Sequence, residues 1–270
     1  MIENALVRID WHGRPRWART TSDYALLQGD GLALRDIIGG SVNDPVRIPL
    51  GDARMLVPLD TSARVFCVGR NFGAHADEMG GERTEQPNFF VRLPSSFVAN
   101  GDELAYPEGV GTYDFEGEIA FVLGIGGRAM DVATARAAIF GATLLMDGSV
   151  RSVQKSSLFL GKNFDGSGAL GPCIVQLPPD LDLRQLRFTT ALNGTQVQSG
   201  CLADTIYSPE ALVSRLSAVL ELRPGDVIST GTPSGVGAAR NPPSWLVPGD
   251  EITVTCEAIG QLRNKVAAIF

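Results

Sequence analysis

The stretch Asp114-Phe115-Glu116-Gly117-Glu118-Ile119-Ala120-Phe121-Val122-Leu123 decides how the rest of this chain is organised. As a strand, it places its large apolar side chains on one face and Asp114, Glu116 and Glu118 on the other, because successive strand side chains point to opposite faces. Carboxylates stacked in this way repel one another, so they need solvent, protonation or a cation. A hard divalent ion such as Mg²⁺ prefers oxygen ligands and suits this face. An acidic, solvated face on an edge strand is an equally good explanation of the pattern.

A possible general base lies upstream of this acidic strand. Residues 63–69 have the pattern of a buried strand that ends in glycine, and the segment that follows carries His75 and Glu78. Residues three apart on a helical turn share a face. A carboxylate beside an imidazole raises its basicity and orients it, as a general base requires. A surface helical pair without a function shows the same spacing, so the pair alone does not decide.

A third acidic residue follows the acidic strand. Asp131 is expected to cap a helix that runs to about Phe140 and stops at Gly141. Residues 142–146 then form an apolar strand that delivers Asp147 at its C-terminal end. A lone aspartate at a strand end is more often a turn or capping residue than a metal ligand.

The C-terminal part of the chain is again rich in β-structure. Asn193-Gly194 predicts a hairpin between two strands, and Ser208-Pro209 predicts the start of an amphipathic helix. The glycine loop of residues 231–237 lacks the Lys-Ser/Thr of a phosphate-binding loop. Its backbone N–H groups, with Thr232, are candidates for holding a carboxylate.

Composition excludes several classes of partner. The 270 residues have a net charge of −7, with 44% hydrophobic and 20% charged residues and no long basic run, which argues against nucleic acid or an anionic membrane as the partner. No apolar run approaches the roughly 20 residues that span a bilayer, and the N-terminus lacks a signal-peptide pattern. The four cysteines have no metal-site spacing. We therefore expect a cytoplasmic protein with buried free thiols.

We expect two regions. Residues 1–60 are predicted to form a small β-rich N-terminal domain, with His12 in a surface turn, and residues 61–270 a larger catalytic domain.

Taken together, these stretches resemble the fumarylacetoacetate hydrolase family, specifically its short, single-catalytic-domain, acylpyruvate hydrolase-like members. The resemblance covers roughly residues 65–264 and rests on the number and order of its motifs. The motifs are Val68-Gly69-Arg70-Asn71-Phe72 with His75 and Glu78, Phe89-Phe90-Val91-Arg92, Asp114-Phe115-Glu116-Gly117-Glu118, Asp147-Gly148-Ser149-Val150-Arg151, Gly161-Lys162-Asn163-Phe164-Asp165, Gly171-Pro172, Gly225-Asp226-Val227-Ile228 and Gly231-Thr232-Pro233-Ser234-Gly235-Val236-Gly237.

The resemblance implies a mixed α/β fold that is predominantly β, a mixed β-sandwich roll with few helices, usually found as a homodimer. It also implies an Mg²⁺ or Mn²⁺ ion held by Glu116, Glu118 and Asp147, with Asp114 just outside the ligand set. Oxygen ligands of this kind are what these ions prefer.

The same resemblance implies catalytic roles for His75, Glu78 and Lys162. The substrate would be a small anionic 2-oxo or β-diketo acid that chelates the metal through two oxygens. His75, oriented by Glu78, would remove a proton from water, and hydroxide would attack the distal carbonyl so that an enolate leaves. Lys162 would pair with the substrate oxygens or with the anion that forms.

Four further residues are candidates for binding the substrate carboxylate, an acceptor that a planar guanidinium suits well. They are Arg70, Arg151, Gln154 and Thr232.

Three activities are consistent with this set, and we expect the first, with the other two as alternatives. The first is hydrolytic cleavage of a carbon–carbon bond in an acylpyruvate such as fumarylpyruvate. The second is decarboxylation or isomerisation of an oxaloacetate-like 2-oxo acid, without an attacking water. The third is metal-dependent binding without turnover.

The third reading is motivated by departures from the family pattern. The family's usual Asn-Asp-Val-Ser-Ala-Arg-Asp reads here as Met146-Asp147-Gly148-Ser149-Val150-Arg151-Ser152, and its usual Lys-Pro is Arg92-Leu93. Residues that surround metal ligands orient them, so these changes predict altered specificity more than lost activity.

Overall fold

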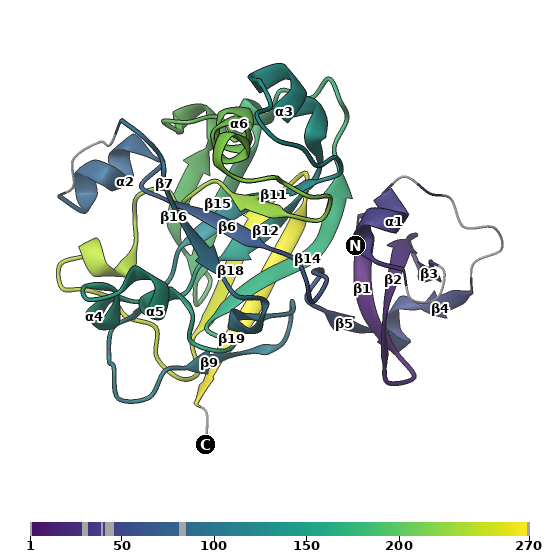
Figure 1. Ribbon diagram of the computed structural model, residues 1–270. Coiled ribbons are helices and arrows are strands. Elements are labelled where there is room, and N and C mark those ends of the chain that lie inside the picture. The colour runs from purple at the N-terminus through teal and green to yellow at the C-terminus, as the bar shows by residue number, and fades with distance from the viewer. Residues whose placement is uncertain (1, 29–31, 39, 41–45, 81–84, 269–270) are drawn as a thin grey trace.

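The computed structural model describes residues 2–28, 32–38, 40, 46–80 and 85–268 (Figure 1). Its largest sheet has the strand order β4-β3-β2-β1-β14-β12-β11-β17-β6-β7, with β5 beside β1 and β8 beside β14. The strands are β1 (Leu6–Trp11), β2 (Arg14–Thr20), β3 (Tyr24–Leu27), β4 (Arg47–Pro49), β5 (Arg54–Leu56), β6 (Val65–Gly69), β7 (Asn88–Arg92), β8 (Phe97–Val98), β11 (Gly117–Leu123), β12 (Ile139–Met146), β14 (Gly168–Gln176) and β17 (Val227–Ser229).

A second sheet packs against the central part of the first. Its strand order is β16-β15-β18-β19-β9. The strands β10 and β13 form a separate short ribbon. These strands are β9 (Glu103–Tyr106), β10 (Tyr113–Asp114), β13 (Ser149–Val150), β15 (Arg187–Leu192), β16 (Thr195–Cys201), β18 (Glu251–Cys256) and β19 (Gly260–Ala268). The main hydrophobic core includes Ile119 and Leu144 of the first sheet and Phe188, Val254 and Leu262 of the second. The fold is therefore mixed α/β and mostly β, as predicted.

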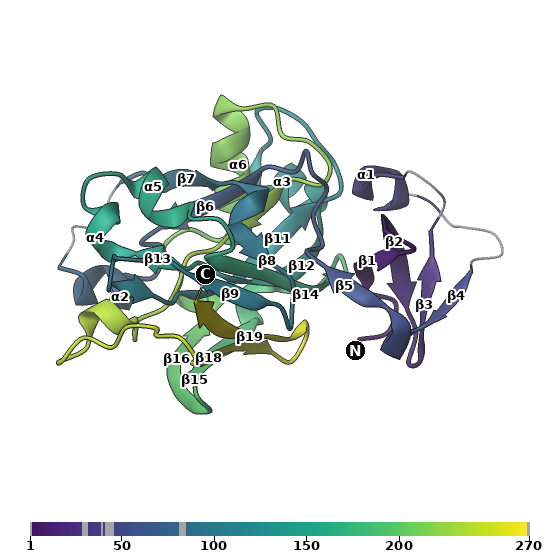
Figure 2. The same ribbon diagram turned by 90° about the horizontal axis from the view of Figure 1, so that it is seen from below.

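The helices are short and lie at the margins of the sheets (Figures 1 and 2). They are α1 (Leu34–Ile38), α2 (Gly73–Glu78), α3 (Val132–Ala138), α4 (Arg151–Gln154), α5 (Leu158–Lys162) and α6 (Pro209–Val219), with 3-10 turns η1 (Leu50–Asp52), η2 (Pro94–Ser96), η3 (Leu183–Gln185), η4 (Leu202–Asp204) and η5 (Gly237–Ala239). Within the described residues, no helix combines the length and the apolar character needed to cross a bilayer. The four cysteines are free and buried, as predicted.

The N-terminal strands form a separate lobe at the right of Figure 1, at one end of the large sheet. β1 joins this lobe to β14 through the pair Leu6↔Ile174. A shared cluster of buried side chains continues across the junction and includes Trp17, Leu34, Leu145 and Leu170. The division into domains at residue 60 stays a prediction.

Two local expectations are wrong. The acidic strand is not continuous: β10 ends at Asp114 and β11 begins at Gly117. The ladder breaks because the side chain of Asp114 accepts the N–H of Phe115, at 2.8 Å. β11 is also buried between β12 and β17, so it is not a solvated edge strand.

The second wrong expectation concerns the helix capped by Asp131, whose side chain accepts the N–H of Thr134. This helix ends at Ala138, and Gly141 lies inside β12 instead of stopping the helix. A Cβ at Gly141 would lie 2.4 Å from the carbonyl oxygen of Val175, so this glycine permits close strand packing.

Candidate active site

Three buried carboxylates meet where β11 begins and β12 ends. These strands are antiparallel neighbours with Gly117 opposite Met146, so Glu116, Glu118 and Asp147 lie at the same end of the pair. The N–H of Asp147 donates to the carbonyl oxygen of Glu116 at 2.8 Å and fixes the two segments together. Each of the three side chains offers one oxygen, and these oxygens lie within 4.8 Å of one another. The structure thus brings together the three residues predicted as metal ligands.

Lys162, at the end of α5, bridges two of these carboxylates. Its Nζ donates to Glu116 Oε2 at 2.5 Å and to Asp147 Oδ2 at 2.6 Å. Burial alone would lower the pKa of Lys162, but Asp147 and Glu116 outweigh burial and raise it. Lys162 is therefore an ammonium group inside the carboxylate cluster, and its predicted pairing with substrate oxygens stays a prediction.

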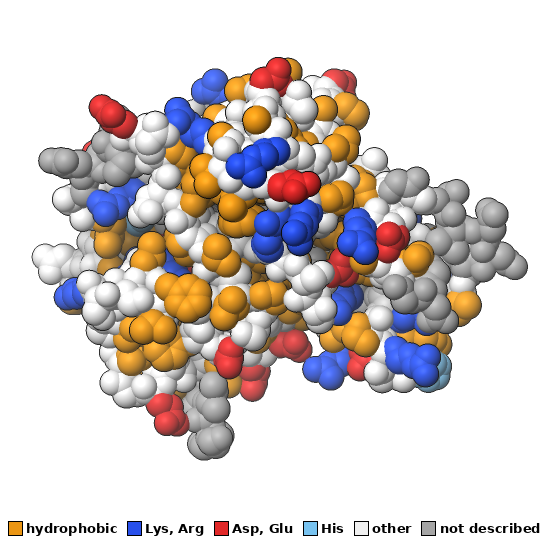
Figure 3. All heavy atoms as spheres, viewed as in Figure 1, with side chains coloured by type: hydrophobic (Ala, Val, Ile, Leu, Met, Phe, Trp, Pro, Cys, Tyr) orange, Lys and Arg blue, Asp and Glu red, His pale blue; other side chains and the backbone are white. Residues whose placement is uncertain are grey.

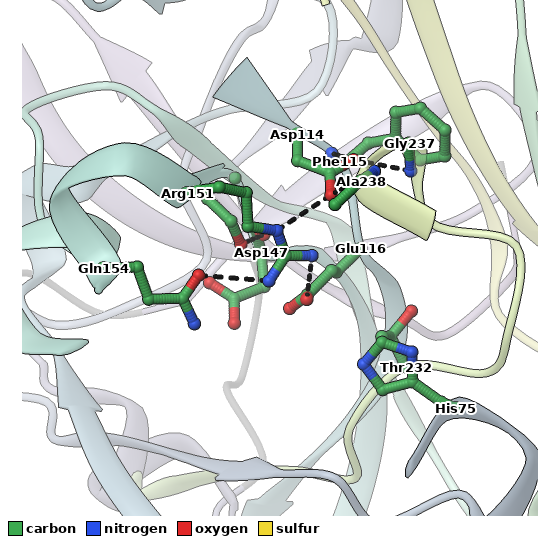
Figure 4. Close-up of polar contacts among 12 residues, drawn as sticks. His75, Asp114, Phe115, Glu116, Asp147, Arg151, Gln154, Thr232, Gly237 and Ala238 are labelled. Atoms are coloured by element: carbon green, nitrogen blue, oxygen red, sulfur yellow. Dashed lines mark hydrogen bonds and ion pairs between the residues drawn. The ribbon is translucent and has the colours of Figure 1, made fainter. Parts of the chain in front are cut away.

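Arg151, at the start of α4, bridges the carboxylates of Asp114 and Glu116 (Figure 4). Its Nε donates to Asp114 Oδ2 at 2.8 Å and its Nη2 to Glu116 Oε1 at 2.6 Å. Asp114 also accepts the backbone N–H groups of Gly237 and Ala238, at 2.7 and 3.1 Å. Asp114 is thus saturated by its own partners and lies outside the three-carboxylate cluster, as expected.

Glu118 differs from the other carboxylates of the cluster. Its partners are the hydroxyl of Ser229 and the backbone N–H of Gly231, and among the described residues no ion pair joins it to a basic side chain. Burial and the charges of Asp147 and Glu116 raise the pKa of Glu118 well above its ordinary value. For Glu116, by contrast, burial alone would raise the pKa, but Lys162 and Arg151 hold it well below its ordinary value.

The charges of the cluster do not balance. Four carboxyl groups, those of Asp114, Glu116, Glu118 and Asp147, face three strong bases, those of Arg92, Arg151 and Lys162, so the fourth carboxyl group ionises only at a cost, as the raised pKa of Glu118 reflects. Buried carboxylates without a counter-charge are costly, and a hard cation with oxygen ligands removes that cost. The donor set and the spacing of its oxygens therefore fit a divalent metal ion.

The predicted pair of a general base, His75, and its orienting carboxylate, Glu78, forms on α2. His75 is buried, and its Nδ1 lies 3.1 Å from Glu78 Oε2. The other oxygen of Glu78 accepts the N–H of Gly235 at 2.8 Å, which ties α2 to the loop of residues 231–237. An ionised carboxylate accepts the Nδ1 proton and leaves Nε2 as the nitrogen that can exchange protons.

Glu116 and Glu118 of the cluster, together with Lys162 and His75, line one cleft of about 650 Å³. Gln154 lines it, and its Oε1 accepts from Arg151 at 3.1 Å (Figure 4), while its amide N–H groups bond no acceptor among the described residues. Thr232 also lines the cleft, but its hydroxyl already donates to the carbonyl oxygen of Gly117 at 3.0 Å. Arg70 lines the cleft in a left-handed backbone conformation, with φ of 57°. The substrate-binding roles of these residues and of Arg151 stay predictions.

Sequence reasoning missed two residues of the site. Arg92 is fully buried and its Nη1 donates to Asp147 Oδ1 at 2.6 Å, although the sequence marks it only as a departure from the family's usual Lys-Pro. Lys155 lines the cleft, and no sequence motif points to it. The substitution of the family's lysine by Arg92 was the one available signal.

The departures near Asp147 have structural explanations. Met146 is buried in the main core. Gly148 is required, because a Cβ there would lie 1.7 Å from the carbonyl oxygen of Ser167. Ser152 accepts the hydroxyl of Thr112 at 2.8 Å at the cleft rim.

Comparison with known proteins places the chain in a family. The family profile described as fumarylacetoacetate (FAA) hydrolase C-terminal matches residues 64–267. Oxaloacetate tautomerase YisK of Bacillus subtilis is 35% identical over 223 residues, which are 80% of this chain and 74% of that protein. The human mitochondrial oxaloacetate tautomerase FAHD2A is 34% identical over 223 residues, 81% of this chain and 71% of that protein.

The solved structures agree with this assignment. The structure of a fumarylacetoacetate hydrolase from Exiguobacterium antarcticum superposes with a TM-score of 0.86 at 30% identity, covering 98% of this chain and 99% of that one. Both the sequence match and the superposition include the strands that carry the carboxylate cluster. The chain therefore belongs to the fumarylacetoacetate hydrolase family.

Proposed function

We propose that this chain is a divalent-metal-dependent enzyme that interconverts the keto and enol forms of a small 2-oxo dicarboxylic acid of the oxaloacetate class. One observation carries the proposal: Glu116 and Glu118, two carboxylates of a cluster that lacks a counter-charge at Glu118, line the same cleft as His75, which Glu78 orients. The names of the two relatives, both oxaloacetate tautomerases, support this substrate class.

Glu116, Glu118 and Asp147 would hold the metal, Mg²⁺ or Mn²⁺. Bound there, the ion would polarise the 2-oxo group and favour the negative charge that develops on its oxygen. Arg151 holds one oxygen of Glu116 and Arg92 holds one oxygen of Asp147, and Lys162 bonds the other oxygen of each. This leaves the ligand set oriented before substrate arrives.

His75 would move the proton. Ketonisation removes a proton from the enol oxygen and adds one to the neighbouring carbon, and the reverse reaction takes the carbon proton away. His75 Nε2 is the group of the cleft suited to this exchange at carbon, because Glu78 holds Nδ1. Glu78 in turn stabilises the imidazolium that forms during the transfer.

A second carboxylate on the substrate has partners at the cleft wall. Arg151, Arg92 and Lys162 are committed to the carboxylates of the protein. Arg70 and Lys155 line the same cleft, and no acidic partner for either occurs among the described residues. These two cations, with the amide of Gln154, favour a dianionic substrate.

Hydrolysis of an acylpyruvate is the second candidate. The cleft is much larger than oxaloacetate, and its walls include the apolar side chains of Val68, Met79, Phe90, Leu158 and Trp245. An acyl group would fill this space. In that reaction His75 would deprotonate water, hydroxide would attack the distal carbonyl, and the bond to the pyruvate carbon would break to give a carboxylic acid and pyruvate.

The test follows enol absorbance. Oxaloacetate enol and fumarylpyruvate are each mixed with the protein and Mg²⁺ or Mn²⁺, and the products are identified by NMR. The proposal expects faster ketonisation of oxaloacetate that conserves all of its carbon atoms. Release of fumarate and pyruvate from fumarylpyruvate, without an effect on oxaloacetate, would favour the second candidate.

His75→Ala separates base catalysis from metal-assisted chemistry. Loss of about 10²- to 10⁴-fold is expected for ketonisation or hydrolysis. Decarboxylation that survives the substitution would identify the protein as a metal-dependent decarboxylase. Thermal stabilisation by ligand and Mg²⁺ without any product would identify a binding protein. A homodimeric state and a cytoplasmic location remain predictions.

A further inference from the structure

Arg92, the last residue of β7, lies wholly inside the protein behind Asp147. Its Nη1 donates to Asp147 Oδ1 at 2.6 Å. Its Nε donates to the hydroxyl of Ser96 at 3.1 Å, and its Nη2 donates to the carbonyl oxygen of Ser96 and the hydroxyl of Ser167, both at 3.2 Å. The planar group also lies over the ring of Phe97, with its central carbon 4.6 Å from the ring centroid.

The residues around Arg92 fit its guanidinium group and leave no space for added side-chain atoms at Gly148 or Gly168. A Cβ at Gly168 would lie 2.7 Å from both terminal nitrogens of Arg92. Gly148, whose carbonyl oxygen is 3.4 Å from Nη1, cannot carry a side chain because Ser167 blocks it. A lysine has one nitrogen on a flexible chain and cannot reach acceptors on three sides with a fixed geometry.

The contacts divide the two oxygens of Asp147. Oδ1 accepts from Arg92, which does not line the cleft, whereas Oδ2 accepts from Lys162, which lines the cleft and also bonds Glu116. A carboxylate held at one oxygen by a rigid, buried fork cannot rotate freely about its last bond. The other oxygen is therefore presented to the cluster in one orientation.

We propose that Arg92 is a positioning residue of the metal site, which fixes Asp147 so that Oδ2 is directed to a cation held with Glu116 and Glu118. This proposal rests on the proposed function, since it assumes that the cluster binds a metal. Arg92 touches neither the cation nor the substrate, and it acts through Asp147. Although the family's usual residue at this position is lysine, the pocket of this chain, formed around Arg92 by Ser96, Ser167 and Gly168, requires the guanidinium shape in addition to the charge.

The test is Mn²⁺ binding by isothermal titration calorimetry, with the substitution Arg92→Lys. We expect binding to weaken by about 10- to 100-fold, the usual effect of removing a group that orients a metal ligand. The matched control is Arg64→Lys, because Arg64 likewise donates to a buried aspartate, Asp226, in its case to both oxygens, but does not line the cleft. The control should bind Mn²⁺ as the wild type does.

The outcomes separate this inference from the proposed function. If the wild type does not bind Mn²⁺, or if Glu118→Gln binds it unchanged, the proposed metal site is wrong. If the wild type binds through Glu118 and Arg92→Lys binds equally well, Arg92 is only structural and the inference is overturned. A lower melting temperature of the metal-free protein with unchanged Mn²⁺ affinity leads to the same rejection.

A second variant covers the case in which Arg92→Lys does not fold. Ser96→Ala removes the partner of Nε and leaves the charge of Arg92 in place. We expect this variant to weaken Mn²⁺ binding by roughly 3- to 10-fold, less than the loss of the whole fork. Unchanged affinity in Ser96→Ala would then overturn the inference on its own.

Discussion

At the scale of single residues, the site depends on carboxylates that differ in their partners. Asp114, Glu116 and Asp147 each contact at least one cation, whereas Glu118 contacts a hydroxyl. An unpaired carboxylate in the interior destabilises the metal-free fold and gives a metal ion its advantage. Glu118 thus lowers the stability of the metal-free protein and, for the same reason, favours metal binding.

Glu118→Gln should therefore stabilise the metal-free protein and abolish tight Mn²⁺ binding. Removing the unpaired charge should raise the free energy of unfolding by about 1 kcal/mol. Asp114→Asn is the control, because it breaks a buried pair with Arg151 and should lower that free energy by about 3 kcal/mol. Denaturant unfolding in EDTA measures both. A destabilised Glu118→Gln would contradict this account of the cluster.

Gly148→Ala tests whether Asp147 needs a glycine beside it. A methyl group 1.7 Å from the Ser167 carbonyl oxygen forces the backbone to move, at a cost of about 1 to 3 kcal/mol. Gly51→Ala, where nothing lies within 4 Å of the added carbon, should be neutral. Thermal unfolding compares the two, and equal melting temperatures would show that Gly148 is not constrained.

The sequence could identify only part of this residue-level arrangement. Alternation of acidic and apolar residues pointed to Glu116 and Glu118, and the family motifs added Asp147. Arg92 could not be found in this way, since its contact with a residue 55 positions away exists only after β7 and β12 have folded together. The same holds for Lys155, which lines one cleft with Arg70 although 85 positions separate the two residues.

At the scale of elements, the site is a junction of strand ends with a short helix. β11 and β12 are antiparallel neighbours, so the start of β11 lies beside the end of β12, which brings Glu118 and Asp147 together. α2 carries His75 to the same cleft. The bond from Gly235 to Glu78 holds α2 against the loop of residues 231–237.

Glu78→Gln should impair the base without removing it. The amide still accepts the N–H of Gly235, but it no longer stabilises a positive charge on His75. We expect kcat for the proton transfer to fall by about 10- to 100-fold with little change in KM. Ala74→Ser, an exposed change on the same helix, is the control. A raised KM with unchanged kcat would argue that Glu78 serves binding instead.

Predictions of elements succeeded where a local signal was sufficient. Asn193-Gly194 connects β15 and β16, and Ser208 caps α6 with Pro209 in its first turn. The predictions failed where contacts between distant parts of the chain determine the local structure. The side chain of Asp114 turns back on its own backbone and interrupts a pattern that reads as one strand. Gly141 follows a predicted helix, as a helix-terminating glycine does, but in the structure it allows β14 to pack closely against β12.

At the scale of the whole molecule, hydrophobic side chains gather on one face. Figure 3 shows them over the region where Figure 1 labels α5. Val91, Leu93, Phe159 and Leu160 are exposed on β7, the turn after it and α5. The side chain of Asn163 bonds both Leu93 and Val91, which holds the two elements together. Apolar patches of this kind are typical of interaction surfaces.

The predicted homodimer can be checked by light scattering. The mass in solution should be twice the 28.7 kDa of one chain. Phe159→Glu with Leu160→Glu places charge on the exposed face, and Val132→Glu, exposed on α3, is the matched control. A wild-type protein of single-chain mass at micromolar concentration would contradict the prediction.

The central claim is that Glu116, Glu118 and Asp147 hold a divalent metal ion, and one measurement tests it most directly. Crystals soaked in Mn²⁺ would be measured by anomalous diffraction at the manganese edge. The account predicts a single strong peak in contact with an oxygen of each of these three carboxylates. An ion bound only by other side chains, or no peak in the cleft at saturating Mn²⁺, would contradict it.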